Sequence, residues 1–168
     1  MDVDEPVELA AYRTDWPRQA EGEMARLRAR LPGDTLLEHI GSTAVPGCEA
    51  KPIVDLLVGT APERRATVAR EIELAGYESL GEAEPGRIYL RRRAPSFNVH
   101  VVELDGQLWR DNLLLRAFLR ADPEARARYI ETKRQALARE QCLLGYSREK
   151  SAPLGELLEE ARRAAIRQ

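Results

Sequence analysis

One apolar run with a carboxylate inside it constrains this chain more than any other segment. Residues 53–58 read Ile-Val-Asp-Leu-Leu-Val, which is typical of a buried β-strand except at Asp55. Burying an unpaired charge is costly, so Asp55 needs a cation or a firm hydrogen-bond partner. Segment 35–40 predicts a strand just before this one, whose expected buried residues are Leu36, Leu37 and Ile40.

A small turn joins these two predicted strands. Gly41-Ser42-Thr43 offers backbone N–H groups and hydroxyls, which suit phosphate oxygens, and Pro46-Gly47 closes a second turn. A phosphate-binding turn followed by a strand carboxylate that can hold Mg²⁺ is the arrangement of a nucleotide-handling site. We therefore expect phosphate at the first turn and a metal at Asp55. Otherwise, Asp55 is a buried carboxylate satisfied by backbone N–H groups or by Lys51.

The residues around this turn resemble the GrpB-like family. The family's core typically reads Glu-His-Ile-Gly-Ser-Thr, a Val-Pro-Gly turn, and then Lys-Pro-Ile-hydrophobic-Asp, and residues 38–47 and 51–55 match this pattern. Residues 98–102, Asn-Val-His-Val-Val, resemble its later His-x-His-Val strand, with Asn98 in place of the first His. Residues 116–123 resemble its Arg-Asp-Tyr-Leu-Arg…Pro segment. The resemblance covers nearly the whole chain. The C-terminal helices of the family typically carry Tyr and Lys where this chain has Tyr129, Lys133, Tyr146 and Lys150.

That family is similar to the nucleotidyltransferase superfamily, in which a Gly-Ser turn precedes a strand carrying Asp-x-Asp or Asp-x-Glu. The resemblance implies Mg²⁺- or Mn²⁺-dependent transfer of a nucleotidyl group from a nucleoside triphosphate to an unknown small-molecule or protein acceptor. In this chain the second acidic residue of that motif is replaced by Leu57. A two-metal site needs two or three carboxylates, so the motif is incomplete here. Glu103 on a later strand, or Glu38 before the turn, would have to compensate. The alternative is a catalytically degenerate module of the same fold that binds a nucleotide or another phosphorylated ligand.

The two histidines of the chain both lie in these motifs. His100 is a candidate to take the acceptor's proton, and it shares a strand face with Asn98 that we expect to look onto the cleft of Asp55. His39 is either functional or a strand histidine hydrogen-bonded within the fold. Together with Asp55, the two histidines could also form a transition-metal site.

Several cations are candidates for the anionic part of a substrate, since phosphate is held by a point charge or a bidentate fork. Tyr129 lies four residues before Lys133, so both share one helical face. That pair could stack a base and hold a phosphate, or could pack between helices. The candidate substrate-binding residues beyond the turn are Lys51, Arg87, Arg91, Arg116, Tyr129, Lys133 and Lys150.

Composition excludes some function classes. Lys and Arg number 26 against 28 Asp and Glu, a net charge of −2, which argues against nonspecific binding to nucleic acid. The chain has no apolar run of membrane-spanning length, and residues 1–5 lack the features of a signal peptide. Cys48 and Cys142 have no metal-ligand spacing and read as reduced thiols. We therefore expect a cytoplasmic protein without a membrane partner.

The pattern of segments predicts a single α+β domain over residues 1–168, with an α/β core in 1–104 and a helical part in 105–168. We expect a small mixed sheet flanked by helices, as in nucleotidyltransferases. Residues 81–86 are expected to form a turn. Helices are predicted from Trp16 onward until Pro32-Gly33 and near 62–75, 107–120, 123–144 and 147–166; further strands are predicted near 77–80, 87–93 and 97–104.

Overall fold

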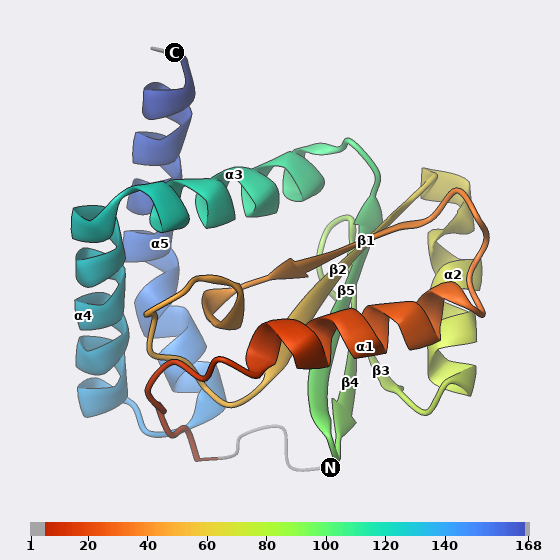
Figure 1. Cartoon of the computed structure of the whole chain (residues 1–168), viewed down its shortest axis with the longest axis horizontal. Coiled ribbons are helices and arrows are strands. Elements are labelled where there is room, and N and C mark those ends of the chain that lie inside the picture. Colours follow the sequence, from red (N-terminus) through yellow and green to blue (C-terminus); the bar gives the residue numbers. More distant parts are fainter. Residues whose placement is uncertain (1–5, 167–168) are drawn as a thin grey trace.

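The computed structural model describes residues 6–166 and has the predicted α+β architecture (Figure 1). Five strands form one sheet in the order β1-β2-β5-β4-β3. The pair β2–β5 is parallel and the other neighbours are antiparallel, so the sheet is mixed, as predicted. The strands are β1 (Leu36–Ile40), β2 (Val54–Thr60), β3 (Glu78–Glu84), β4 (Arg87–Arg93) and β5 (Ser96–Glu103).

The described part of the chain forms five α-helices, of which α1, α2 and α3 pack on the sheet. Within residues 6–166, no helix is both long and apolar enough to cross a membrane. The helices are α1 (Trp16–Arg28), α2 (Arg65–Leu74), α3 (Gln107–Ala121), α4 (Pro123–Arg139) and α5 (Leu143–Ile166), with short 3₁₀ turns η1 (Ser42–Ala44) and η2 (Pro62–Arg64).

Helices α1 and α2 cover one face of the sheet. Trp16 and Leu27 of α1 are fully buried there, which agrees with the periodicity expected of a helix that packs on a sheet. Alternate strand residues such as Leu56 and Val99 meet them from the sheet. This face therefore forms the main hydrophobic core.

The opposite face is covered over only part of its area. Trp109 of α3 packs on Ile40, Leu57 and Val102, and it lies so close to Gly59 that a Cβ there would be 2.7 Å from the indole ring. Farther along the same face the strands carry polar residues, beginning with Asp55 on β2. That polar half is the floor of the cleft described below.

The helices α4 and α5 form a second core with the segment that follows the Gly-Ser turn. Arg120 of α3 also donates a hydrogen bond from Nε to the carbonyl of Ala44, at 2.8 Å. The helical part is thereby attached directly to the turn. The buried residues of this cluster are Val45, Cys48, Leu119, Ala125, Tyr129 and Leu157.

Several predicted boundaries were wrong. Strand β3 continues to Glu84, through part of the predicted turn, because irregular pairing with β4 accommodates Gly81 at φ 80°. The last predicted helix starts at Leu143, and α5 runs through Pro153 because its apolar residues pack against α3 and α4. Leu36 is 51% exposed, since it begins an edge strand.

Candidate functional site

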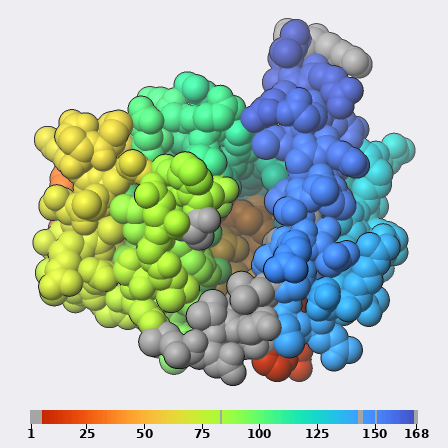
Figure 2. Space-filling view, turned by 180° about the vertical axis from the view of Figure 1, so that it is seen from behind, coloured from red at the N-terminus to blue at the C-terminus, as the bar shows by residue number. Residues whose placement is uncertain are grey.

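A cleft of about 550 Å³ lies over the polar half of the sheet. In Figure 2 the surface is hollowed between the β3–β4 hairpin, in green, and α5, in blue, with the segment around the Gly-Ser turn visible at depth in brown. The cleft therefore lies between the α/β core and the helical part. Its lining includes Gly41, Ser42, Lys51, Asp55, Arg87, Tyr89, Asn98, His100, Tyr129, Tyr146 and Ser147.

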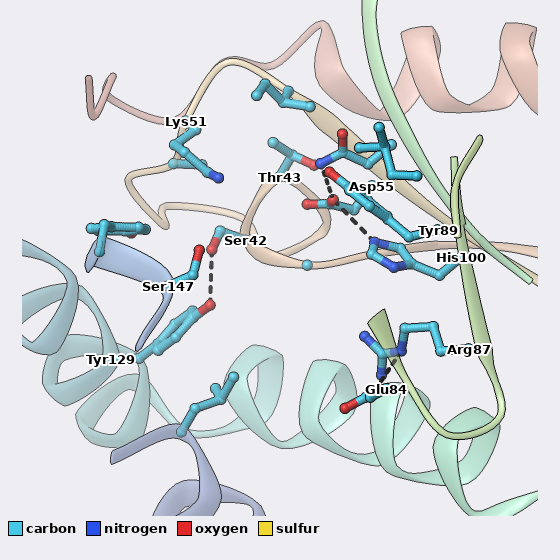
Figure 3. Close-up of a pocket in the computed structure, with 17 residues that line it drawn as sticks. Ser42, Thr43, Lys51, Asp55, Glu84, Arg87, Tyr89, His100, Tyr129 and Ser147 are labelled. Atoms are coloured by element: carbon cyan, nitrogen blue, oxygen red, sulfur yellow. Dashed lines mark hydrogen bonds and ion pairs between the residues drawn. The ribbon is translucent and has the colours of Figure 1, made fainter. Parts of the chain in front are cut away.

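Asp55 has the hydrogen-bond partners that its buried strand requires. Its Oδ1 accepts hydrogen bonds from Asn98 Nδ2 at 2.9 Å and from His100 Nε2 at 3.4 Å (Figure 3). These contacts follow from the register, because β2 and β5 are parallel with Asp55 opposite Asn98. The expected common face of Asn98 and His100 is therefore confirmed.

The carboxyl group of Asp55 is ionised in this setting. Burial by itself would raise its pKa, but the hydrogen bond and charge of His100 and the hydrogen bond of Asn98 outweigh that effect. The pKa of Asp55 is thereby lowered to about 2, with a further contribution from the charge of Lys51. The side chain remains 28% exposed, so it can still meet a ligand.

Gly41 brings the turn into contact with this carboxylate. Its backbone has φ 73° and ψ −171°, a conformation that is essentially restricted to glycine. A Cβ at this position would lie 2.7 Å from Oδ2 of Asp55, closer than atoms can pack. Glycine is thus required both for the conformation and for the approach of the turn to Asp55.

Ser42 is bonded to the helical part. Its Oγ lies 3.1 Å from the hydroxyl of Tyr129 and accepts a hydrogen bond from Lys133 Nζ at 3.2 Å. Tyr129 and Lys133 share a face of α4, as predicted, but the structure places Lys133 at 1% exposure, outside the cleft lining. The expected direct contact between Lys133 and a phosphate is therefore not supported by its position.

Thr43 lines the cleft, but its hydroxyl is bonded to His39, which does not line it. Thr43 is 1% exposed, and its Oγ1 lies 2.9 Å from His39 Nε2. Burial lowers the pKa of His39 to about 4. Because His39 pairs with Leu56, it lies on the sheet face opposite Asp55. The hypothesis of a transition-metal site formed by Asp55, His100 and His39 was wrong.

The two carboxylates expected to assist Asp55 are not beside it. Glu103 pairs with Thr60, which is five residues beyond Asp55 on β2, so it lies roughly 16 Å away and on the opposite face. Glu38 shares the face of Asp55, but Arg116 Nη1 binds its Oε2 at 2.7 Å and the carbonyl of His39 at 2.6 Å.

Neither Glu38 nor Arg116 lines the cleft. Arg116 binds two residues of strand β1 and is not placed to contact a substrate in the cleft. Among the residues that the structure describes, no group of three or more His, Cys, Asp or Glu side chains is placed to hold a metal ion.

Two cations do line the cleft. Lys51 lies beside the site, with Nζ 5.7 Å from the centre of the Tyr146 ring. Arg87 lines the other side and binds Glu84 at 2.7 Å (Figure 3). The side chain of Lys150 lies outside the described residues, although its backbone belongs to α5.

Sequence reasoning missed Tyr89. Its ring stacks on His100, with centroids 5.1 Å apart and an angle of 27° between the planes. Tyr89 pairs with His100 across β4 and β5, so the two side chains lie on one face. The predicted strands 87–93 and 97–104 were the available signal, but a turn over residues 94–96 would have set Tyr89 opposite Val101, whereas the observed register begins with Arg93 opposite Ser96.

Known proteins share the sequence pattern and the fold of this chain. The family model described as GrpB protein matches residues 6–160. A UPF0157 protein of Streptomyces coelicolor is 38% identical over 127 residues, which cover 75% of this chain and 68% of that protein. The crystal structure of conserved protein GrpB from Enterococcus faecalis has a TM-score of 0.83 at 32% identity, covering 95% of this chain and 99% of that one.

The fold also resembles that of a nucleotidyltransferase. The Cid1 poly(U) polymerase, in a structure with bound Mg 3'-dATP, has a TM-score of 0.54 at 18% identity and covers 77% of this chain and 43% of its own. At that identity the likeness concerns the fold alone. The expected nucleotidyltransferase-like fold is confirmed.

Proposed function

This chain belongs to the GrpB family, and on that basis we propose that its cleft binds a nucleotide, with the phosphates at the Gly41-Ser42 turn. The observation that carries the proposal is the direct approach of this turn to the ionised Asp55, in a cleft that Lys51 also lines. The turn offers N–H groups and a hydroxyl, and the lysine offers positive charge, which together suit a polyphosphate. The nucleotidyltransferase-like fold supports the same ligand class.

The donors at this site do not fit two metal ions. A two-metal site needs several carboxylates, whereas Leu57 is fully buried and Glu103 and Glu38 lie elsewhere. A single Mg²⁺ bound through one protein carboxylate and the ligand's phosphates does fit Asp55. Mg²⁺ held in this way would supply neutralisation of the phosphate charge.

Nucleotidyl transfer to an unidentified acceptor is the second candidate function. The orientation of Asp55 favours it, because Asn98 and His100 fix one carboxylate oxygen and direct the ionised group at the turn. In such a transfer these residues would hold the carboxylate in place, and Ser42 and the backbone N–H groups would hold phosphate oxygens. His100 is unsuited to take the acceptor's proton, since its Nε2 is bonded to Asp55 and its Nδ1 is buried.

Thermal melting tests nucleotide binding. We expect one of ATP, GTP, CTP and UTP to stabilise the protein in the presence of Mg²⁺, because a ligand at one hundred times its Kd adds about 2.7 kcal/mol. For a chain of this size this corresponds to a rise in Tm of roughly 5–10 °C. The shift should be lost in Asp55→Asn and reduced in Ser42→Ala. Glu103→Gln, which changes a strand carboxylate outside the cleft, is the matched control and should keep it.

Two results separate the candidates. If no nucleotide raises Tm at millimolar concentration, the proposed ligand class is wrong. If one does, release of pyrophosphate from that nucleotide is measured with a small-molecule cell extract as the source of acceptor. Release that depends on Asp55 supports transfer, whereas binding without release supports a module that only binds its ligand.

A further inference from the structure

Lys133 places an ammonium group inside the second core. Its Nζ donates to Ser42 Oγ at 3.2 Å, to Cys48 Sγ at 3.2 Å and to the carbonyl of Glu49, and it lies 4.6 Å from the centre of the Tyr129 ring. Cys48 has no exposed surface and Lys133 has 1%, so water does not screen this charge well. The fully bonded ammonium therefore acts on the groups that surround it.

Ser42 connects this buried charge to the cleft. A serine hydroxyl has one hydrogen to donate and two lone pairs to accept with, and a lysine ammonium can only donate. Lys133 thus occupies one lone pair of Ser42 Oγ. Burial raises the pKa of Tyr129, so the phenol keeps its proton and can donate to the second lone pair across 3.1 Å.

When Tyr129 is the donor of that bond, both lone pairs of Ser42 are occupied and its hydrogen is left for a third partner. Ser42 and Tyr129 line the cleft and Lys133 does not, so this partner must come from the cleft side (Figure 3). A hydroxyl that accepts a hydrogen bond from a cation is also a stronger donor, because chained hydrogen bonds polarise one another. An anionic oxygen is the partner that such a donor favours.

We infer that Lys133 is a positioning residue, which orients and polarises the Ser42 hydroxyl for an anionic ligand without touching the ligand itself. This inference rests on the proposed function for the identity of the ligand, namely a phosphate oxygen of a nucleotide. The coupling between Lys133 and Ser42, however, exists in the protein without ligand and can be measured there.

The ligand-free test converts Ser42 into a reporter of the charge. In the background of Cys142→Ser, the variant Ser42→Cys is alkylated with iodoacetamide across a range of pH, and the modified site is assigned by peptide fragmentation. A thiol beside a lysine ammonium ionises at a pH below the usual value of about 8.5. We expect the alkylation of the thiol at position 42 to have its pH midpoint about one unit below that value. Adding Lys133→Met should return the midpoint toward the usual value and so slow alkylation at pH 7 several-fold.

Ser147→Cys is the matched control, because Ser147 also lines the cleft and, within residues 6–166, is not among the hydrogen-bond partners of Lys133. Should the variant Lys133→Met fail to fold, the midpoints of the thiols at positions 42 and 147 are compared in the chain that keeps Lys133. A lower midpoint at position 42 supports the inference. Equal pH midpoints at positions 42 and 147 would overturn it. A midpoint at position 42 that does not change in Lys133→Met would also overturn it.

A second test uses the nucleotide that raises Tm. Lys133→Met should weaken binding roughly tenfold in the natural chain, yet change it less than about twofold when Ser42→Ala is already present, because residues acting through one contact are not additive. Independent losses would mean that Lys133 meets the ligand directly. If no nucleotide binds, the proposed function fails, while the alkylation experiment still decides whether Lys133 acts on Ser42.

Discussion

Replacing Gly41 by alanine tests the central feature of the site, the contact between the turn and Asp55. The backbone conformation at φ 73° and ψ −171° costs a residue with a Cβ about 1–3 kcal/mol. The new Cβ would also lie 2.7 Å from Oδ2 of Asp55, so the carboxylate must move. Weakening its hydrogen bond to Asn98 would cost about 1 kcal/mol more. We expect Gly41→Ala to lower the free energy of unfolding by about 2–4 kcal/mol.

Equilibrium unfolding in urea measures this loss as a lower midpoint at constant slope. Gly22→Ala is the matched control, because Gly22 lies inside α1, where an added Cβ would have no atom within 4 Å, and the change should gain up to about 1 kcal/mol in helix stability. The variant Asp55→Ala then separates the two costs. Adding Gly41→Ala to it should cost little beyond the backbone strain, since the clashing oxygen is gone and the Cβ of residue 55 would lie 3.2 Å away.

A free energy of unfolding for Gly41→Ala within about 0.5 kcal/mol of that of the natural chain, a range typical of surface substitutions, would refute this prediction. An equal cost in the presence and absence of the Asp55 carboxylate would refute the steric part alone. In that case the turn would not be held against Asp55 in solution.

Three further perturbations probe the surrounding structure. Gly59→Ala should destabilise the fold by about 1–3 kcal/mol, because its Cβ would lie 2.7 Å from the Trp109 ring; an unchanged urea midpoint would contradict that packing. The pKa of His39 falls from 6.5 to about 4 on folding, so the folded state binds fewer protons and stability should fall by roughly 3 kcal/mol between pH 7 and pH 4. This pH dependence, measured by urea unfolding, should largely disappear in His39→Gln, and its persistence would point to other groups. Leu57→Asp should lower stability by at least about 3 kcal/mol, since it buries a charge beside Trp109, and a rise in Tm with Mg²⁺ alone would show instead that a second metal ligand is tolerated there.

Local patterns were sufficient to predict much of the fold. The alternation in residues 97–104 placed Asn98 and His100 on one face, and the cleft confirms that placement. The apolar run around Asp55 predicted a buried strand whose carboxylate needs a cation or a firm hydrogen-bond partner; the strand is present, and Asn98 and His100 are the hydrogen-bond partners. These predictions succeeded because strand alternation and the cost of burying a charge act within a few residues of chain.

The ends of the helices were harder to predict from the sequence. The last helix was predicted from residue 147, yet α5 begins four residues earlier at Leu143 and continues through Pro153. A proline inside a helix is unfavourable by itself, and burial of residues such as Leu157 against the neighbouring helices offsets that cost. Such compensation depends on partners that are far away in the sequence.

The sequence by itself determined which residue types could carry the chemistry: a glycine turn, one strand carboxylate, and a strand that offers an amide and an imidazole. Only the tertiary structure decided which of them meet. Alternation along β5 already sets Glu103 on the face opposite Asn98, but only the pairing of β2 with β5 placed it beside Thr60, five residues along the sheet from Asp55, because position depends on register. The packing of α4 on the turn likewise buries Lys133 outside the cleft, where its ammonium group bonds to Ser42. Both outcomes depend on contacts between segments more than forty residues apart, and no local pattern encodes how such segments align.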